Sequence, residues 1–335
     1  MALINYFYHH RYYKNMDFLK QVIGTELKQF EQKFTSNTLS NNLLLNKIMH
    51  FIINRKGKQM RPMFILLSAK IAGTINESTY RAASLIELLH TATLTHDDVV
   101  DNSMIRRNFF SVNALWKNKV AVLAGDYLLS KGLLLALEFK DYEILEITSR
   151  AVKEMSEGEL LQIEKARKLD IEEAVYFEII RAKTASLLSA SCAAGAYSSS
   201  KDPVLTEHFR LLGEKIGIAF QIKDDLFDYG KDAVGKPLGI DIKEKKMTLP
   251  LIYALSKADA STKRKIIYLI KNKNTDKKSV EQVIEFVVSS GGIAYATEKM
   301  NEYLNESIKM LDRFPESEAK TAMIQLINFA VNRTY

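Results

Sequence analysis

The sequence contains very few of the residues that build disulfides and tight turns. Cys192 is the only cysteine, which excludes an internal disulfide and a zinc site made of cysteines. The 335 residues include 14 glycines and 5 prolines, well below the average usage of about 7% and 5%. Because so few residues favour turns, the sequence predicts long helices. The single cysteine fits a reducing, cytoplasmic setting.

Long runs of one kind are also missing. The formal net charge is +7, but basic stretches such as Lys263–Lys265 are short, so we expect no nucleic-acid partner. No continuous apolar run reaches the ~18–20 residues that a membrane span needs. The first residues are aromatic and basic, without the apolar core of a secretory signal. We therefore expect no transmembrane span.

Apolar residues recur at helical spacing along most of the chain. Between Arg81 and Asp101, for example, Leu85, Leu89 and Ala92 follow one another at intervals of three or four. The hydrophobic fraction of 47% is enough for a large core. We predict an all-α fold in a single domain, residues 18–335, preceded by an N-terminal arm, residues 1–17. A separate C-terminal subdomain after residue 257, where charge rises, is the alternative.

Two groups of aspartates stand at the ends of otherwise apolar helical segments. In "THDDVVD", Asp97 and Asp101 are four residues apart and share a helix face, whereas Asp98 lies about 100° to one side. In "FQIKDDLFD", Gln221 begins a polar stripe at positions i, i+3, i+4 and i+7. The other members of that stripe are Asp224, Asp225 and Asp228.

A solvated helix face is the simpler explanation for either group alone. Such faces usually mix lysine with glutamate, whereas here most members are aspartate and the pattern occurs twice. Clustered carboxylates with few cations beside them favour Mg²⁺, which binds oxygen ligands together with substrate phosphates. The candidate metal ligands are Asp97, Asp98, Asp101, Asp224, Asp225 and Asp228.

Several short motifs carry cations suited to binding a diphosphate. They are "GKQMRP", the Arg pair that follows the first aspartate group, "AKT", and "GKPLGIDIKEKKMT". Arginine offers a bidentate fork to phosphate and lysine a point charge, although each motif alone is a common surface feature. The residues are Lys58, Arg61, Arg106, Arg107, Lys183, Lys236 and Lys246.

Taken in order, these motifs resemble those of the trans-isoprenyl (polyprenyl) diphosphate synthases. The likeness runs from about Leu44 to the C-terminus and includes "ELLHTATLTHDDVVD", "NKVAVLAGDYLL", "MSEGELLQ", "AKTASLL" and "GIAFQIKDDLFD". It implies the isoprenoid synthase fold, in which antiparallel helices surround a central cavity, usually in a homodimer. It also implies a reaction: an allylic diphosphate loses pyrophosphate, isopentenyl diphosphate attacks the resulting cation, and a proton then leaves.

The resemblance also implies a role for each matching residue. Lys183, Thr184 and Gln221 would be catalytic, the latter two through dipoles near the reacting carbons. Three Mg²⁺ ions would accompany the bound allylic diphosphate. Arg106, Lys236 and Lys246 would contact substrate, and Lys58, Arg61, His90 and Arg107 match the isopentenyl diphosphate site. The alternative for His90 is a core histidine, and for "MSEGELLQ" helix packing rather than contact of Glu157 and Gln162 with the cavity.

The chain departs from the family pattern at a few loop positions. The Arg pair is followed by Asn108 and Phe110, where relatives usually have Gly and Pro. Lys117 and Lys245 also stand where relatives usually have Gly. No proposed ligand is lost, and Phe109–Phe110 are expected to cover the site or to contact a partner.

Product length is predicted from the helix that carries the first aspartates. In the family a bulky residue five positions before the first aspartate stops elongation early, and here that position is Ala92. The next bulky residues on that side, Leu88 and Leu89, lie about one turn deeper, and a turn of 5.4 Å is about one isoprene unit. We expect farnesyl or geranylgeranyl diphosphate as primer, and by resemblance a product of about six to eight units.

Three alternatives to this prediction remain. A short-chain synthase would stop at farnesyl or geranylgeranyl diphosphate. A class I terpene cyclase usually has Asn and Ser or Thr in its second motif, which "DDLFD" argues against. A non-catalytic subunit of a heteromeric synthase tends to lose the aspartate motifs, which this chain keeps. A transient membrane contact for product release is compatible with the sequence.

Overall fold

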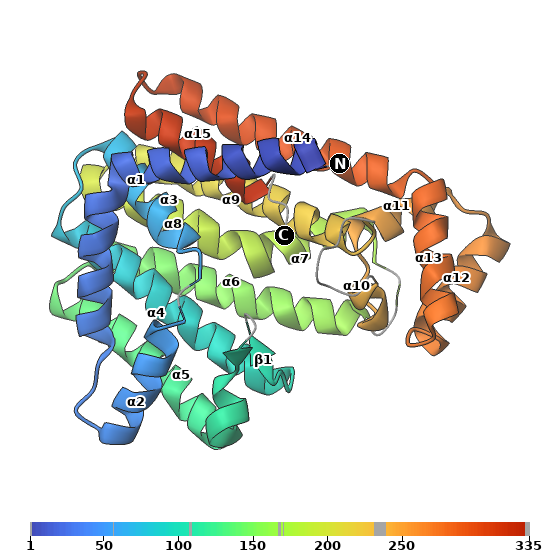
Figure 1. Cartoon of the computed structure of the whole chain (residues 1–335), viewed down its shortest axis with the longest axis horizontal. Helices are drawn as coiled ribbons and strands as arrows, with labels where there is room; N and C mark the ends of the chain where they lie inside the picture. The colour runs from blue at the N-terminus through green and yellow to red at the C-terminus, as the bar shows by residue number, and fades with distance from the viewer. Residues whose placement is uncertain are drawn as a thin grey trace. The chain divides into compact units, whose positions relative to one another are not determined.

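The computed structural model describes residues 2–55, 57–106, 109–166, 169, 171–230 and 239–331, with side chains from Asp17 onward. Nearly all of the described secondary structure is helical (Figure 1), which confirms the all-α prediction. The helices are α1 (Ala2–Thr38), α2 (Leu43–Ile53), α3 (Met60–Ala72), α4 (Glu77–Val100), α5 (Val112–Glu138), α6 (Tyr142–Ala166), α7 (Glu173–Ile180), η1 (Arg181–Ala185), α8 (Ser186–Ser200), α9 (Pro203–Phe227), α10 (Ile240–Lys243), α11 (Leu249–Lys257), α12 (Ala260–Asn272), α13 (Lys277–Ser289), α14 (Gly292–Lys309), η2 (Met310–Arg313) and α15 (Glu318–Val331).

The chain forms two compact units, and neither is one continuous stretch. Unit 1 comprises residues 1–152, 190–211 and 314–326, and unit 2 comprises 153–189, 212–313 and 327–335. Within unit 1, α4 packs against α1, α3 and α5. Within unit 2, α11 packs against α7, α13 and α14, and α12 packs against α13.

Helix α4 is placed by a strong start and an apolar middle. The Asn76 side chain accepts hydrogen bonds from the backbone of Ser78 and Thr79, and the Thr79 hydroxyl accepts one from the backbone N–H of Asn76, forming a capping box. From there the helix buries Leu85, Ile86 and their neighbours before it reaches the first aspartates. The capped start and the buried middle therefore hold the aspartate end of α4 in place.

The departures from the family pattern have structural counterparts. Between α4 and α5, strands β1 (Ile105–Arg106) and β2 (Phe109–Phe110) pair antiparallel, with Arg106 opposite Phe109. Helix α5 is kinked at Lys117, whose φ of 71° and ψ of 162° belong to a region used almost only by glycine. Lys245 also has a left-handed φ, of 59°. The chain thus keeps glycine-like backbone at two positions where it has lysine.

The N-terminal residues and α5 each add to what the sequence indicated. The backbone of the predicted arm is helical from Ala2 and forms the first part of α1. In the described part of the chain, α5 alone has the length and apolarity of a membrane span, with mean hydropathy 1.7 and a third of that stretch buried. Core helices also meet these criteria, and Asp126 and Lys131 lie within this apolar stretch.

Candidate active site

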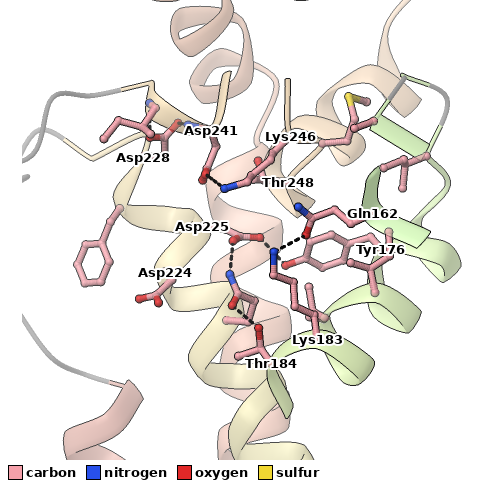
Figure 2. Close-up of a pocket in the computed structure, with 18 residues that line it drawn as sticks. Gln162, Tyr176, Lys183, Thr184, Asp224, Asp225, Asp228, Asp241, Lys246 and Thr248 are labelled. Carbon is pink, nitrogen blue, oxygen red and sulfur yellow. Dashed lines mark hydrogen bonds and ion pairs between the residues drawn. The ribbon is translucent and has the colours of Figure 1, made fainter. Parts of the chain in front are cut away.

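Unit 2 contains a cavity of about 360 Å³ into which most of the residues predicted for its half of the site project (Figure 2). Its walls come from α6, α7, η1, α9, α10 and the residues that lead into α11. One part of the lining is apolar, including Ile179, Ile180 and Phe227. The polar part is formed by Gln162, Tyr176, Lys183, Thr184, Gln221, Asp224, Asp225, Asp228, Asp241, Lys246 and Thr248.

A chain of hydrogen bonds orients the two predicted dipolar residues. The hydroxyl of Thr184 donates to Gln221 Oε1 at 2.8 Å, and Gln221 Nε2 donates to Asp225 Oδ1 at 2.8 Å. Tyr176, from α7, donates its hydroxyl to the other oxygen of Asp225 at 2.7 Å. Asp225 is therefore held by two protein donors, and it fixes the amide of Gln221 with its oxygen toward Thr184.

The buried position of Asp225 alters its acidity. Burial, followed by the nearby charge of Asp241, raises the pKa of Asp225 to about 7, against the lowering effect of its hydrogen bonds. Burial also raises the pKa of Tyr176 well above its usual value, so its hydroxyl stays a donor at neutral pH. Figure 2 shows Asp224 pointing away from this contact, and its side chain is half-exposed.

Lys183 and Thr184 lie in a turn of π-helix, η1, rather than in regular α-helix. Such turns are rare and occur frequently at functional sites. The ammonium of Lys183 forms an ion pair with Glu159 and donates to Gln162 Oε1 at 3.3 Å. Gln162 of "MSEGELLQ" therefore does contact the cavity, whereas Glu157 is exposed and pairs with Lys153 at 3.4 Å.

Two glycines allow η1 to lie where it does. A Cβ on Gly158 of α6 would lie 2.7 Å from Ala182 Cβ and 2.9 Å from the backbone nitrogen of Lys183. A Cβ on Gly217 of α9 would lie 2.5 Å from Ala185 Cα. Because such approaches are shorter than packed carbon atoms tolerate, η1 requires glycine on both sides.

Asp228, the last aspartate of the second motif, anchors the returning loop. Its carboxylate accepts hydrogen bonds from the backbone N–H of Ile240 at 2.7 Å and of Asp241 at 3.2 Å, at the start of α10. Burial raises the pKa of Asp228, and the hydrogen bonds from Asp241 and Ile240 oppose that rise. The Asp228 carboxylate therefore fixes the position at which α10 begins.

The same loop carries Lys246, which was predicted to bind substrate, and Asp241, which was not among the predicted site residues. Lys246 Nζ lies 2.5 Å from Glu244 and 3.7 Å from Asp241. Burial alone would lower the pKa of Lys246, but the hydrogen bond to Glu244 and the charge of Asp241 raise it, so the ammonium is retained. Burial and the charge of Asp228 raise the pKa of Asp241 to about 6. Its place within "GKPLGIDIKEKKMT" was the available signal.

The three aspartates of the first group, in unit 1, differ in exposure as their helical spacing indicates. Asp97 and Asp101 are exposed, whereas Asp98 is buried and accepts a hydrogen bond from Arg106 Nε at 2.6 Å. Burial raises the pKa of Asp98, and the guanidinium opposes that rise. The backbone oxygen of Asp98 also accepts Asn113 Nδ2 at 3.1 Å. Asp98 thus holds Arg106 and ties the end of α4 to α5.

A second cavity, of about 110 Å³, lies within unit 1 and is lined in part by His90, Asp98 and Arg106. His90 is mostly buried but lines this cavity. Arg55, which was not among the predicted site residues, places its guanidinium 3.5 Å from the centre of the Phe51 ring. It also donates to the backbone oxygen of Phe110 at 3.1 Å, and Phe110 is one of the residues that line the cavity.

The remaining predicted residues are placed as follows. Gly57 and Gln59, on either side of Lys58, line the unit 1 cavity, and Lys58 itself is exposed. Arg61 is half-buried in the first turn of α3. Ala92, Leu88 and Leu89 are buried in α4 and line neither cavity. Arg107 and Lys236 lie outside the described residues.

The donor set suits a hard divalent cation that retains water. Among residues 2–55, 57–106, 109–166, 169, 171–230 and 239–331, no three His, Cys, Asp or Glu side chains converge on one point as a complete metal site. Asp97 and Asp101 present carboxylate oxygens to solvent, and Asp224 does so in part. Mg²⁺ is commonly bound in this way, through a few carboxylates, waters and substrate phosphates.

Comparison with known proteins agrees with this geometry. Residues 42–287 match the family model described as polyprenyl synthetase. The chain is 34% identical to all-trans-nonaprenyl-diphosphate synthase (geranyl-diphosphate specific) of Rhodobacter capsulatus, over 95% of this chain and 99% of that protein. It is 30% identical to octaprenyl diphosphate synthase of Escherichia coli, over the same shares.

Solved structures are similar across nearly the whole chain. A polyprenyl synthase of Caulobacter crescentus, complexed with calcium and isoprenyl diphosphate, has a TM-score of 0.85 at 32% identity, covering 95% of this chain and 97% of that one. A geranylgeranyl pyrophosphate synthase of Bacteroides thetaiotaomicron has a TM-score of 0.81 at 37% identity, covering 96% and 100%. With its motifs, its helical fold and these relatives in agreement, the chain belongs to the polyprenyl synthetase family and is a trans-polyprenyl diphosphate synthase, a prenyltransferase.

Proposed function

We propose that this enzyme adds isopentenyl diphosphate repeatedly to farnesyl or geranylgeranyl diphosphate and releases an all-trans product of about six to eight isoprene units. The observation that carries the proposal is the unit 2 cavity, where Lys183, Thr184, Gln221 and Asp224 project into one space. Cationic, dipolar and carboxylate groups are therefore within reach of one diphosphate and its first carbons.

The chain's own residues supply charge where the reaction develops it. When the carbon–oxygen bond of the allylic diphosphate breaks, the pair of electrons leaves with pyrophosphate. The ammonium groups of Lys183 and Lys246 stabilise that anion from fixed positions. The oxygens of Thr184 and Gln221 present the negative ends of their dipoles to the allylic cation. The double bond of isopentenyl diphosphate then attacks the cation, and a proton leaves, for which the family resemblance implies the released pyrophosphate as acceptor.

We propose Asp97, Asp101 and Asp224 as ligands of divalent cations, with Mg²⁺ as the physiological ion. Their carboxylates are exposed or half-exposed, which ligation to a hydrated ion requires. Bound Mg²⁺ would supply Lewis-acid stabilisation of the diphosphate. Asp98, Asp225 and Asp228 are buried and accept hydrogen bonds from Arg106, Gln221 and the start of α10, and we assign them to positioning these groups.

We propose that the enzyme is a homodimer in the cytoplasm. The exposed surface of α5 supports the homodimer. Its outer surface exposes Val122, Leu123, Leu134 and Leu137, at helical spacing, and Leu123 and Leu134 are each about 60% exposed. An apolar strip of this length in contact with water is typical of an interface. A second copy of the chain would bury it.

Product sizing tests the proposed function. The purified chain is incubated with radiolabelled isopentenyl diphosphate, farnesyl diphosphate and Mg²⁺, and the dephosphorylated products are separated by reversed-phase chromatography. We expect products of about six to eight units. Products no longer than geranylgeranyl would favour the short-chain alternative, which the 37% identity to the Bacteroides enzyme supports. No product from the chain alone would favour a subunit of a heteromeric enzyme.

The metal assignment has its own test. Asp97→Ala should reduce kcat by orders of magnitude at saturating Mg²⁺, because one carboxylate ligand is lost, whereas Asp312→Ala, an exposed aspartate on η2, should leave it unchanged. Calorimetric titration with Mg²⁺ and pyrophosphate should show weaker binding for Asp97→Ala. Near-normal activity in that variant would overturn the assignment.

A further inference from the structure

A strongly basic surface is formed by the end of α11, α12, and the start of α13, residues 257–278. This segment, called here the basic surface, has only Asp259 and Asp276 as acids. Its excess of six positive charges compares with +7 for the entire chain. Every one of its basic side chains is exposed: Lys257, Lys263, Arg264, Lys265, Lys271, Lys273, Lys277 and Lys278.

The two acids offset only two of the eight positive charges, and both are engaged as helix caps. Asp259 accepts hydrogen bonds from the N–H groups of Ser261 and Thr262 and caps α12, and Asp276 caps α13 through Ser279. In the described part of the chain, Lys277 alone among the eight lies within ion-pair distance of a carboxylate, that of Glu281 at 3.9 Å. The positive charge is therefore directed to solvent.

An exposed aromatic side chain lies within the positive face of α12. Tyr268 is 54% exposed and follows Arg264 by four residues and precedes Lys271 by three, so the three share one helix face. The opposite face of α12 is apolar and buried, through Ile266 and Ile270 among others. The basic face with Tyr268 is therefore the one presented to solvent, and tyrosine beside cations is typical of side chains at a lipid–water interface.

The basic surface is tied to the loop that lines the active-site cavity. Lys245 Nζ donates to the backbone oxygen of Lys271 at 2.9 Å, and Asn274 Nδ2 donates to the backbone oxygen of Lys243 at 2.5 Å. Asp241 and Lys246, on the same loop, line the cavity. The charged face and the catalytic loop are therefore one connected structure within unit 2.

We propose that the basic surface docks on an anionic lipid bilayer. The choice of a bilayer rests on the proposed function, because a product with a long apolar chain and a diphosphate head belongs at a membrane surface. Each Lys or Arg near such a surface contributes about 1 kcal/mol, and eight are exposed here. A single-stranded nucleic acid would be bound by several aromatics as stacking platforms, whereas residues 257–278 include only Tyr268.

Vesicle binding without substrates tests this surface separately from catalysis. The full chain is sedimented with vesicles of phosphatidylcholine alone, or of phosphatidylcholine with about 30% phosphatidylglycerol, at low and high salt. We expect binding to the anionic vesicles only, and its loss as salt rises. Removing three charges in Lys263→Gln/Arg264→Gln/Lys265→Gln should weaken the partition coefficient about 100-fold.

The matched control removes three exposed lysines elsewhere, in Lys20→Gln/Lys28→Gln/Lys309→Gln, and should bind as the unaltered chain does. Equal loss in both variants, binding to neutral vesicles, or no binding at all would overturn the proposal. Tighter binding of a 30-nucleotide single strand than of anionic vesicles at equal salt would also overturn it. Prenyltransferase turnover in detergent should be unchanged in the charge variants. Absent turnover with intact vesicle binding would refute only the proposed function.

Discussion

At the scale of single residues, one backbone conformation does not suit its side chain. Lys117 has φ and ψ values almost restricted to glycine, and that strain costs about 1–3 kcal/mol in folded structures. The family resemblance placed glycine at this position, and the structure retains the kink that glycine would allow. The departure from the family pattern therefore lies in the lysine side chain and not in the backbone kink.

Lys117→Gly should raise the free energy of unfolding by about 1–3 kcal/mol, because glycine adopts this conformation without steric strain. The midpoint of urea-induced unfolding, followed by circular dichroism, measures the change. Lys119→Gly is the control, since Lys119 is exposed and helical in α5, and glycine there should lower stability by about 0.5–1 kcal/mol. Equal destabilisation in the two variants would contradict the strain argument.

Ala92→Phe should shorten the product, because a ring at this buried position would fill the space proposed for the growing chain. The assay is the product sizing described above, with total incorporation of isopentenyl diphosphate as a check that the variant still folds. An unchanged product length with retained activity would show that Ala92 does not line the path of the product.

At the scale of elements, the π-helical turn η1 sets the positions of Lys183 and Thr184, the residues proposed to be catalytic. It follows α7 directly, and its two polar residues reach Gln162 and Gln221 from one turn of chain. Its backbone is closely packed against Gly158 and Gly217. The position of Lys183 thus depends on a missing side chain on a neighbouring helix.

Gly158→Ala should lower stability by about 1–3 kcal/mol and reduce kcat by about 100-fold, because its methyl group would displace the backbone of Lys183. Unfolding midpoints and steady-state kinetics give the two quantities. Gly24→Ala in α1 is a matched control: its Cβ would meet nothing closer than 3.8 Å, and alanine should slightly stabilise that helix. Unaltered kinetics in Gly158→Ala would show that η1 tolerates the shift.

At the scale of the whole molecule, the apolar strip on α5 leads to a prediction about assembly. Leu123→Glu/Leu134→Glu should convert the proposed dimer to monomer, because two carboxylates would be buried in an apolar contact. Sedimentation equilibrium at several concentrations measures the state. Leu160→Glu, a similarly exposed leucine on α6, should have no effect. A monomeric parent chain would refute the dimer directly.

The fold class and the helix faces of the first aspartates could be predicted from the sequence alone. The helical period of apolar residues indicated the all-α fold, and the spacing of Asp97, Asp98 and Asp101 indicated which two share a face. These inferences succeed because helical periodicity is local, so sequence spacing translates directly into direction.

The tertiary structure decided what sequence spacing could not. Six aspartates carry the same side chain, yet Asp98, Asp225 and Asp228 hold protein groups while Asp97 and Asp101 are presented to solvent. Tyr176 and Asp241 line the unit 2 cavity, and Arg55 lines the unit 1 cavity. Residues distant in the chain form these cavities with them, so sequence spacing did not indicate their positions. The sequence by itself determined the fold class and which aspartates share a helix face. The role of each carboxylate depended on burial and on partners from other elements, which are set by the packing of the folded chain.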